Sequence, residues 1–408
     1  MRWVSTLSTR ASLEAAVTEV VEAARAALEA PADLGLVFIS SAFASDYSRL
    51  MPLLAERLSV PALIGCSGGG VVGMASGEKA EEIEGKPALS LCLAHLPGVE
   101  VRPFHLTTEE LPDLDSSPED WVELIGVHPQ NYPQFILLID PFYGKINDLL
   151  QGLDYAYPGA PKVGGLASSG AMGQGTAVFC DGELYAGEAV GVALSGNIVL
   201  DTIVAQGCRP IGDPYRITRG DRNIILQVEK QDAAGGGELS PLEALQELLG
   251  ELGEEDRQLA GHSLFVGVVR DEFKQQLEAG DFLLRNLIGV DPRMGAIAIG
   301  DRVRPGQRIQ FHLRDARTSA EDLELLLKNQ DTPARPGAVQ TRGALMFSCL
   351  GRGENLYGEP NFDSNLFRRH FPIPLSGFFC NGEIGPVGNG TFLHGYTSVF
   401  GICRQPEN

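Results

Sequence analysis

The sequence predicts a mixed α/β protein in which internally duplicated strand–helix–strand–hairpin units form mixed β-sheets flanked by helices. Three observations predict this class. Short apolar runs alternate with amphipathic helical segments along most of the chain. The same order of elements returns after 100 residues. Glycine supplies 49 of the 408 residues, above its usual share of about 7%, which indicates many tight turns or close backbone approaches.

The first unit follows an amphipathic helix. Apolar residues repeat at helical spacing from Leu13 to Leu28, which predicts a helix over 12–29. We then expect a buried strand at 36–39, a helix that includes Leu50 to Leu58, and a short strand at 61–64. That strand leads into a glycine-rich turn at 65–70.

The second unit repeats the first. Residues 136–139 match 36–39, and residues 161–165 match 61–65, so we predict an internal repeat of about 34–96 and 134–196. A third, weaker copy is expected near the C-terminus. It has a strand at 344–349, a helix at 362–369, a glycine-rich turn at 382–385 and a last strand at about 392–402.

The region between the copies contains further elements. We expect strands at 197–206, 223–229, 264–269, 285–288 and 296–299. Ser240-Pro-Leu-Glu243 has the N-cap, the first-position proline and the capping-box glutamate of a helix start, and Gly253 is expected to end that helix. Ser319 is expected to cap a helix over 320–328.

Two segments are predicted to connect these parts, a glycine-rich joint at 231–237 and a proline-containing linker at 332–337. The predicted domains are 1–210, which holds the repeat, and 211–408.

The formal net charge of −21 makes the chain repel nucleic acids and anionic membranes. We therefore expect neither as a partner. Of the 25 arginines, 19 lie in residues 208–408. This asymmetry has two explanations, a codon preference for arginine or an anion-binding site in the second half.

The sequence indicates a cytoplasmic protein. It has no apolar run of 18 residues and no secretory leader. Its seven cysteines are odd in number and far apart, without a Cys-x-x-Cys pair, which argues against a disulfide framework and a zinc ribbon. The histidines lack metal-ligand spacing, so we expect no metal site.

Three C-terminal motifs resemble the C-terminal half of FIST domains: Phe347-Ser-Cys-Leu-Gly-Arg-Gly353, residues 374–386 (PLSGFFCNGEIGP) and residues 392–397 (FLHGYT). Residues 34–73 are similar to the N-terminal half. The resemblance implies a sensory domain, found in bacterial signalling proteins and in some F-box proteins, and proposed to bind small ligands such as amino acids. It implies no catalytic residue and no cofactor, and it allows for a signalling protein as partner.

Candidate ligand contacts come from these motifs. The glycine-rich turns could cradle an anion with backbone N–H groups, or they could simply be tight turns that need glycine. Arg352 could hold a ligand carboxylate in a fork, or pair with structural acids. The predicted ligand-binding residues are Cys66, Ser67, Gly68, Cys349, Arg352, Gly353, Asn381, Gly382, Glu383 and His394.

Three functions follow as hypotheses. The first is a non-catalytic sensor that binds an amino acid or another small carboxylate in a pocket between the halves. The second is a thiol-dependent hydrolase or transferase in which Cys349 and His394 form a catalytic pair, which requires the two side chains within hydrogen-bond reach. The third is an adaptor that acts through protein contacts.

Overall fold

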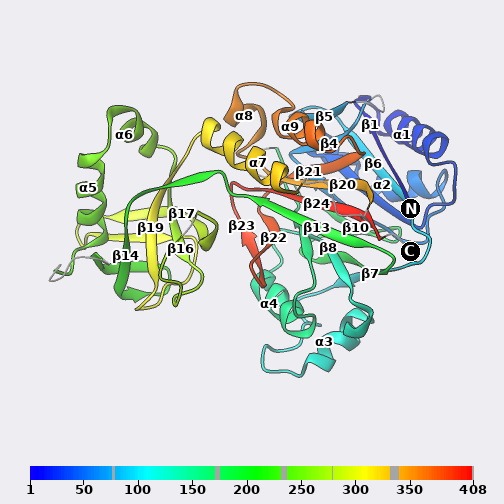
Figure 1. Cartoon of the computed structure of the whole chain (residues 1–408). Helices are drawn as coiled ribbons and strands as arrows, with labels where there is room; N and C mark the ends of the chain where they lie inside the picture. The colour runs from blue at the N-terminus through cyan, green and yellow to red at the C-terminus, as the bar shows by residue number, and fades with distance from the viewer. Residues whose placement is uncertain (76–78, 171–174, 231–236, 278, 331–339, 407–408) are drawn as a thin grey trace. The chain divides into compact units, whose positions relative to one another are not determined.

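The computed structural model describes residues 1–75, 79–170, 175–230, 237–277, 279–330 and 340–406. The chain forms two compact units (Figure 1). The first unit combines Met1–Ala205 with Glu324–Asn408, and the second consists of Gln206–Leu323. The predicted domains, 1–210 and 211–408, stay a prediction. The compact units divide the chain differently, because the first unit contains residues from both predicted domains.

The first unit contains three six-stranded sheets, here named A, B and C. Sheet A has the order β1 (Arg2–Ser8), β6 (Leu89–His95), β2 (Leu34–Ser40), β3 (Leu63–Gly68), β10 (Val178–Cys180), β11 (Glu183–Tyr185). Sheet C has the order β7 (Val99–Leu106), β12 (Ala189–Gly196), β8 (Gln134–Ile139), β9 (Lys162–Leu166), β22 (Glu383–Val387), β23 (Gly390–His394). Sheet B has the order β13 (Val199–Ala205), β24 (Ser398–Gln405), β20 (Gln340–Cys349), β21 (Leu375–Cys380), β4 (Gly70–Met74), β5 (Ala80–Glu84).

Each sheet is built on the same plan, which confirms the predicted duplication and its third copy. The predicted match of 161–165 with 61–65 is wrong by one residue, because Leu137 pairs with Gly164 as Val37 pairs with Gly65. A parallel pair stands at the centre: β2 with β3, β8 with β9, and β20 with β21. An antiparallel strand flanks each pair on one side: β6, β12 or β24. On the other side lies a hairpin that comes from a different copy. The first copy gives β4 and β5 to sheet B, the second gives β10 and β11 to sheet A, and the third gives β22 and β23 to sheet C.

Glycine allows the parallel strands to approach closely. A Cβ atom on Gly65, Gly164 or Gly377 would lie 2.2, 1.8 or 1.8 Å from the backbone carbonyl oxygen of the residue opposite. The predicted glycine-rich turns at 65–70 and 382–385 are wrong in part. Strand β3 includes Gly65, whose close contact with Val37 of β2 requires glycine, and continues to Gly68, and β22 begins at Glu383 inside the second predicted turn.

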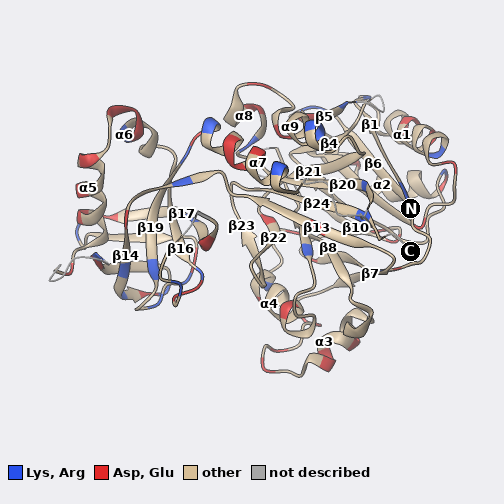
Figure 2. Cartoon of the chain, viewed as in Figure 1, with Lys and Arg blue, Asp and Glu red and all other residues tan. Residues whose placement is uncertain are grey.

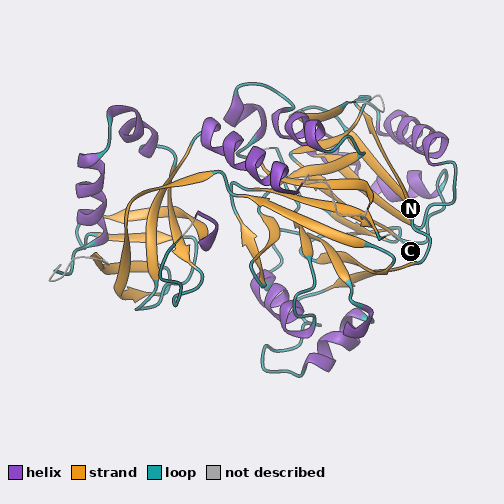
Figure 3. Ribbon diagram, viewed as in Figure 1, coloured by secondary structure: helices purple, strands orange, loops and turns teal. Residues whose placement is uncertain are grey.

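The three sheets share one apolar core, to which each contributes buried residues: Trp3, Leu36 and Phe38 from sheet A, Ile136 and Leu138 from sheet C, and Leu345, Phe347 and Phe378 from sheet B. Helices α1 (Leu13–Leu28) and α2 (Tyr47–Ala55) pack on the other face of sheet A. Helices α3 (Pro118–Ile125) and α4 (Ile146–Ala156) cover sheet C. Near sheet B lie α8 (Gly353–Tyr357) and α9 (Phe362–His370). Figure 3 shows the strands of this unit enclosed by its helices.

The second unit contains a closed barrel. Its strands follow the order β14 (Cys208–Asp221), β15 (Ile224–Lys230), β18 (Ala296–Ile299), β17 (Phe282–Asp291), β16 (Leu264–Val269), β19 (Arg308–Arg314). Helix α5 (Pro241–Glu251) packs on it and α6 (Glu254–Ala260) follows. Ser240 and Glu243 form the predicted capping box at the start of α5.

Three predicted boundaries are wrong. Gly253 does not end α5 but stands at the N-cap of α6. Helix α7 (Ala316–Gln330) begins before Ser319, whose hydroxyl donates to the Gly207 carbonyl at 3.0 Å. The last predicted strand is two strands, β23 and β24, because Tyr396 between them adopts a positive φ of 61°. The predicted linker at 332–337 and most of the joint at 231–237 lie outside the described residues.

Candidate functional site

The C-terminal candidate residues meet where the parallel pair of sheet B ends. Cys349 and Cys380 are register partners and the last residues of β20 and β21. Arg352 and Gly353 follow the first strand, and Glu383 follows the second. Ligand sites of α/β sheets commonly lie at the carboxyl ends of parallel strands.

Arg352 is fully buried and makes a two-pronged contact with Asp363. Its Nε lies 2.8 Å from Asp363 Oδ2, and its Nη2 lies 3.0 Å from Oδ1. Nη2 also lies 2.6 Å from the Tyr357 hydroxyl, which itself donates to Asp363 at 2.9 Å. This geometry is a bidentate guanidinium–carboxylate pair, so both side chains are fixed in orientation.

Glu383 is the second buried acid of this region. Its Oε2 accepts a hydrogen bond from the Thr397 backbone N–H at 3.0 Å, whereas its Oε1 has no well-formed hydrogen bond within the described residues, although the Cys349 thiol and the backbone N–H of Glu383 itself act on the carboxyl. Burial raises the pKa of Glu383 well above its ordinary value, although the Thr397 N–H, the charge of Arg352 and the weakly donating Cys349 thiol act in the opposite direction.

Glu82 is brought to the same place by the exchanged hairpin of the first copy. Its Oε1 accepts from the Ser364 backbone N–H at 2.7 Å, and its Oε2 has no hydrogen-bond partner within the described parts of the chain. Burial, reinforced by the charge of Asp363, raises the pKa of Glu82 to about 8. We call Glu82, Arg352, Asp363 and Glu383 the buried charge cluster.

The charge balance of this cluster explains the raised pKa values. Three carboxyl groups and a single guanidinium lie together where water is excluded. Ionisation of all three carboxyls would leave uncompensated buried negative charge, which is costly. Asp363 holds the ion pair with Arg352, and the surplus of buried acid raises the pKa of Glu82 to about 8 and that of Glu383 well above its ordinary value.

Two residues at the border of the cluster show how tightly it is built. A Cβ on Gly353 would lie 2.3 Å from Glu84 Oε1, and φ of Gly353 is +61°. The Glu84 carboxylate accepts the backbone N–H of Glu354 at 3.0 Å. Burial raises the pKa of Glu84 as well. Gly353 is therefore required where this acid meets the start of α8.

The N-terminal candidates lie in the core of the first unit. Burial raises the pKa of the Cys66 thiol well above its ordinary value. The Ser67 hydroxyl donates to the Ser168 carbonyl at 3.2 Å and accepts the Ala177 N–H at 3.1 Å. A Cβ on Gly68 would lie 3.0 Å from the Phe378 side chain. These contacts join three chain segments.

The remaining candidates have different environments. The Asn381 side chain is exposed, and its backbone N–H donates to the Leu166 carbonyl at 3.0 Å. Gly382 adopts a φ of +148°, which side chains rarely adopt. His394 is the register partner of Glu383, and its Nε2 donates to the Gly385 carbonyl at 3.0 Å. Cys349 is half-buried. The pairing of Cys349 with His394 as a catalytic dyad stays a prediction.

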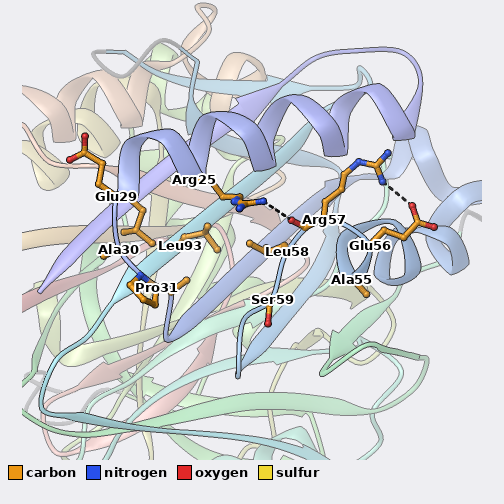
Figure 4. Close-up of a pocket in the computed structure, with 12 residues that line it drawn as sticks. Arg25, Glu29, Ala30, Pro31, Ala55, Glu56, Arg57, Leu58, Ser59 and Leu93 are labelled. Atoms are coloured by element: carbon orange, nitrogen blue, oxygen red, sulfur yellow. Dashed lines mark hydrogen bonds and ion pairs between the residues drawn. The ribbon is translucent and has the colours of Figure 1, made fainter.

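A pocket of about 550 Å³ lies elsewhere, at the C-terminal ends of α1 and α2 (Figure 4). Arg25 reaches across it to the Arg57 carbonyl at 3.3 Å, and Arg57 pairs with Glu56 at 3.0 Å. The pocket is lined by none of the predicted site residues.

Sequence reasoning missed Asp363, Tyr357, Glu82 and Glu84. Asp363 lies in the first turn of a predicted helix, where an acid is ordinarily explained by the helix dipole. Glu82 and Glu84 alternate around Ile83, which is the strand pattern that puts both acids on one face. The alternation could have marked Glu82 and Glu84 as acids on one face of a strand. The sequence does not show, however, that β4 pairs with β21, which brings this hairpin into sheet B.

In the described part of the chain, every helix is too short or too polar to cross a bilayer.

A family model described as the FIST N domain matches residues 33–231, and one described as the FIST C domain matches residues 241–386. An uncharacterized protein of Mycobacterium tuberculosis is 32% identical over 400 residues, which cover 97% of this chain and 98% of the relative. An uncharacterized protein of Mycobacterium bovis is 32% identical over 384 residues, 92% of this chain and 91% of the relative. F-box only protein 22 of Homo sapiens is 36% identical over 76 residues, 14% of this chain and 19% of that protein.

Proposed function

We propose, since this chain belongs to the FIST family, that it is a non-catalytic sensory protein that binds a small amine-bearing ligand of the amino-acid class at the buried charge cluster. One observation carries the proposal. Glu82 Oε2 and Glu383 Oε1 are buried carboxyl oxygens without a well-formed hydrogen bond in the described parts of the chain, although the Ser364 hydroxyl acts on Glu82, and the Cys349 thiol and the Glu383 backbone N–H act on Glu383. Buried polar atoms are usually partnered in native proteins, so two such oxygens beside one ion pair favour a ligand that donates to them.

The chemistry of the two oxygens defines what would bind. An ammonium group offers three N–H donors and a positive charge. It would donate to an unpartnered carboxyl oxygen of the cluster and supply the positive charge that the cluster lacks. Arg352 already donates twice to Asp363, so we assign it the positioning of that acid and an electrostatic attraction for the ligand's own carboxylate.

Two residues near the cluster in the sequence reach the surface, and a ligand would approach past them. Cys349 is half-buried, and Asn381 is exposed two residues before Glu383. The Asn381 side-chain amide can both donate and accept, which suits the polar end of an amino acid.

Binding would change the protonation of the cluster. Burial raises the pKa of Glu82 to about 8, so this carboxyl is mostly protonated at neutral pH, and burial raises the pKa of Glu383 in the same direction. An incoming ammonium favours the charged carboxylates, so the protein would release protons as the ligand enters.

Calorimetry with a panel of amino acids tests the proposal. We expect wild-type protein to bind at least one member, with a binding enthalpy that depends on the ionisation enthalpy of the buffer. Glu82→Gln and Glu383→Gln should each weaken binding at least tenfold. Glu81→Gln is the matched control, because Glu81 precedes Glu82 on β5 and points to the other face of the strand. Failure of every amino acid to bind, or equal binding by the Glu383 variant, would exclude this function.

A further inference from the structure

A second candidate site lies in the barrel unit. A pocket of about 440 Å³ is lined by Arg222, Asn223, Arg302, Val303 and Arg304. Two loops form it, the turn between β14 and β15 and the segment between β18 and β19. Three of its five lining residues are arginines, in a chain whose net charge is −21.

Backbone hydrogen bonds hold the two loops together. The Val303 N–H donates to the Arg222 carbonyl at 2.7 Å, and the Ile299 N–H donates to the Asn223 carbonyl at 3.0 Å. The Val303 side chain is buried beneath the loops. The three guanidinium groups are therefore carried by a backbone that is already fixed, which lowers the entropic cost of binding.

The three arginines differ from four paired arginines of the barrel unit, although Arg219 and Arg293 are likewise exposed without a described ion pair. Arg209, Arg216, Arg285 and Arg308 each form an ion pair with an acid. Arg222, Arg302 and Arg304 are exposed, and the described residues provide no acid in ion-pair contact with any of them. Asp301 accepts the Arg302 backbone N–H, but its carboxylate is committed to Arg285. Asp221, exposed at the same turn, is the nearby acid that reduces the positive charge of the pocket.

The backbone at Arg222 is strained. Its φ is +54°, in the left-handed region that glycine or asparagine occupies at much lower cost. Arg222 and Asn223 form the two-residue turn of the β14–β15 hairpin, and such turns place their first residue at positive φ. The hairpin therefore fixes where the Arg222 side chain leaves the backbone.

Three clustered guanidinium groups match an anion with several acceptor oxygens. Guanidinium forks bind phosphate in a bidentate manner, and phosphate carries up to two negative charges. Nucleic acid is disfavoured by the charge of the whole chain. We propose that this pocket binds the phosphate group of a small molecule. Figure 2 shows basic residues, drawn in blue, at several positions on the barrel strands, and acidic residues, drawn in red, on α6.

Titration of the full-length protein with phosphate compounds, followed by calorimetry and by phosphorus NMR, tests the proposal. The ligands are inorganic phosphate, pyrophosphate and glycerol 3-phosphate. We expect saturable binding that the double variant Arg302→Gln, Arg304→Gln weakens at least tenfold. Tighter binding of glycerol 3-phosphate than of inorganic phosphate would identify a phosphate ester as the ligand, and the reverse would identify the free ion.

A control variant outside the pocket and a stability measurement separate loss of binding from loss of folding. Arg257→Gln removes an exposed arginine that is paired with Glu254 outside the pocket, and it should leave binding unchanged. The Arg302 and Arg304 side chains are exposed, so the double variant should keep the wild-type melting temperature. Absence of saturable binding, or equal weakening by Arg257→Gln, would overturn the proposal. The amino-acid experiment above addresses other residues, so either proposal can fail without the other.

Discussion

Glycines at equivalent positions show how single residues determine this fold. Gly65, Gly164 and Gly377 each face the carbonyl oxygen of the neighbouring parallel strand at a distance that leaves no room for a methyl group. The strands can pair only because these positions lack a side chain. High glycine content therefore reflects close contact between strands as much as turns.

Replacement of Gly377 tests this conclusion. Gly377→Ala would put a Cβ 1.8 Å from the Met346 carbonyl oxygen, so the strands must separate. We expect the free energy of unfolding to fall by about 3 kcal/mol, as for other overpacked sites. Gly144→Ala is the control, because a Cβ at that position would have nothing within 4 Å. Urea unfolding of both variants gives the comparison, and equal losses would contradict the explanation.

The sequence predicted candidate residues better than it predicted their partners. Arg352 and Glu383 stood out by their place in recognisable motifs, and both are buried in one cluster. The partner of Arg352 is Asp363, in a different element, and Glu82 comes from a hairpin of another copy. Such partners depend on strand order, and strand order follows from long-range packing that local patterns do not encode.

At the scale of elements, the repeat was recognised because each copy buries its strands on both faces. Continuous apolar runs such as 36–39 and 136–139 mark these strands directly. The exchanged hairpins were harder to predict because β10 and β11 contain only three residues each. Strand β14, with 14 residues, alternates buried and exposed positions around three shifts of register, which obscure its period.

The start of α5 provides a prediction at this scale. Ser240 accepts the Glu243 N–H at 3.2 Å, and the Glu243 carboxylate accepts the Ser240 N–H at 3.0 Å. Ser240→Ala should lower the free energy of unfolding of the barrel unit by about 1 kcal/mol, since one helical N–H loses its partner. Gln246→Ala, an exposed substitution in the same helix, should change it by less. Chemical denaturation measures the free energy of unfolding of both variants. An equal loss in Gln246→Ala would argue against the stabilising role of the Ser240 cap.

At the scale of the molecule, the two units should respond to pH in opposite directions. Burial lowers the pKa of His312 in the barrel to about 4, so its contribution to stability is present above pH 6.5 and is lost as the pH falls toward 4. Burial raises the pKa of Glu82 to about 8, so its contribution is present below pH 4.5 and is lost as the pH rises through about 8.

Scanning calorimetry at pH 5, 7 and 8.5 checks this expectation. Between pH 7 and pH 5 the barrel should lose about 2 kcal/mol through His312, and His312→Asn should remove this loss. Between pH 5 and pH 8.5 the first unit should lose stability, and Glu82→Gln should lessen that loss. If the variants show the same pH dependence as wild-type protein, these two groups do not control it.

The exchange of hairpins also has a consequence for synthesis on the ribosome. Val72 of β4 pairs with Gly377 of β21, so the hairpin is made about 300 residues before its partner strand. At a translation rate of 5–20 residues per second, the edge of β4 that will pair with β21 stays unpaired for about 15–60 s. Unpaired strand edges of this kind promote aggregation. The barrel strands, in contrast, all lie within residues 208–314 and can close while translation continues. A nascent chain stalled before residue 375 would thus expose an open sheet, and chaperones that shield such edges should associate with it.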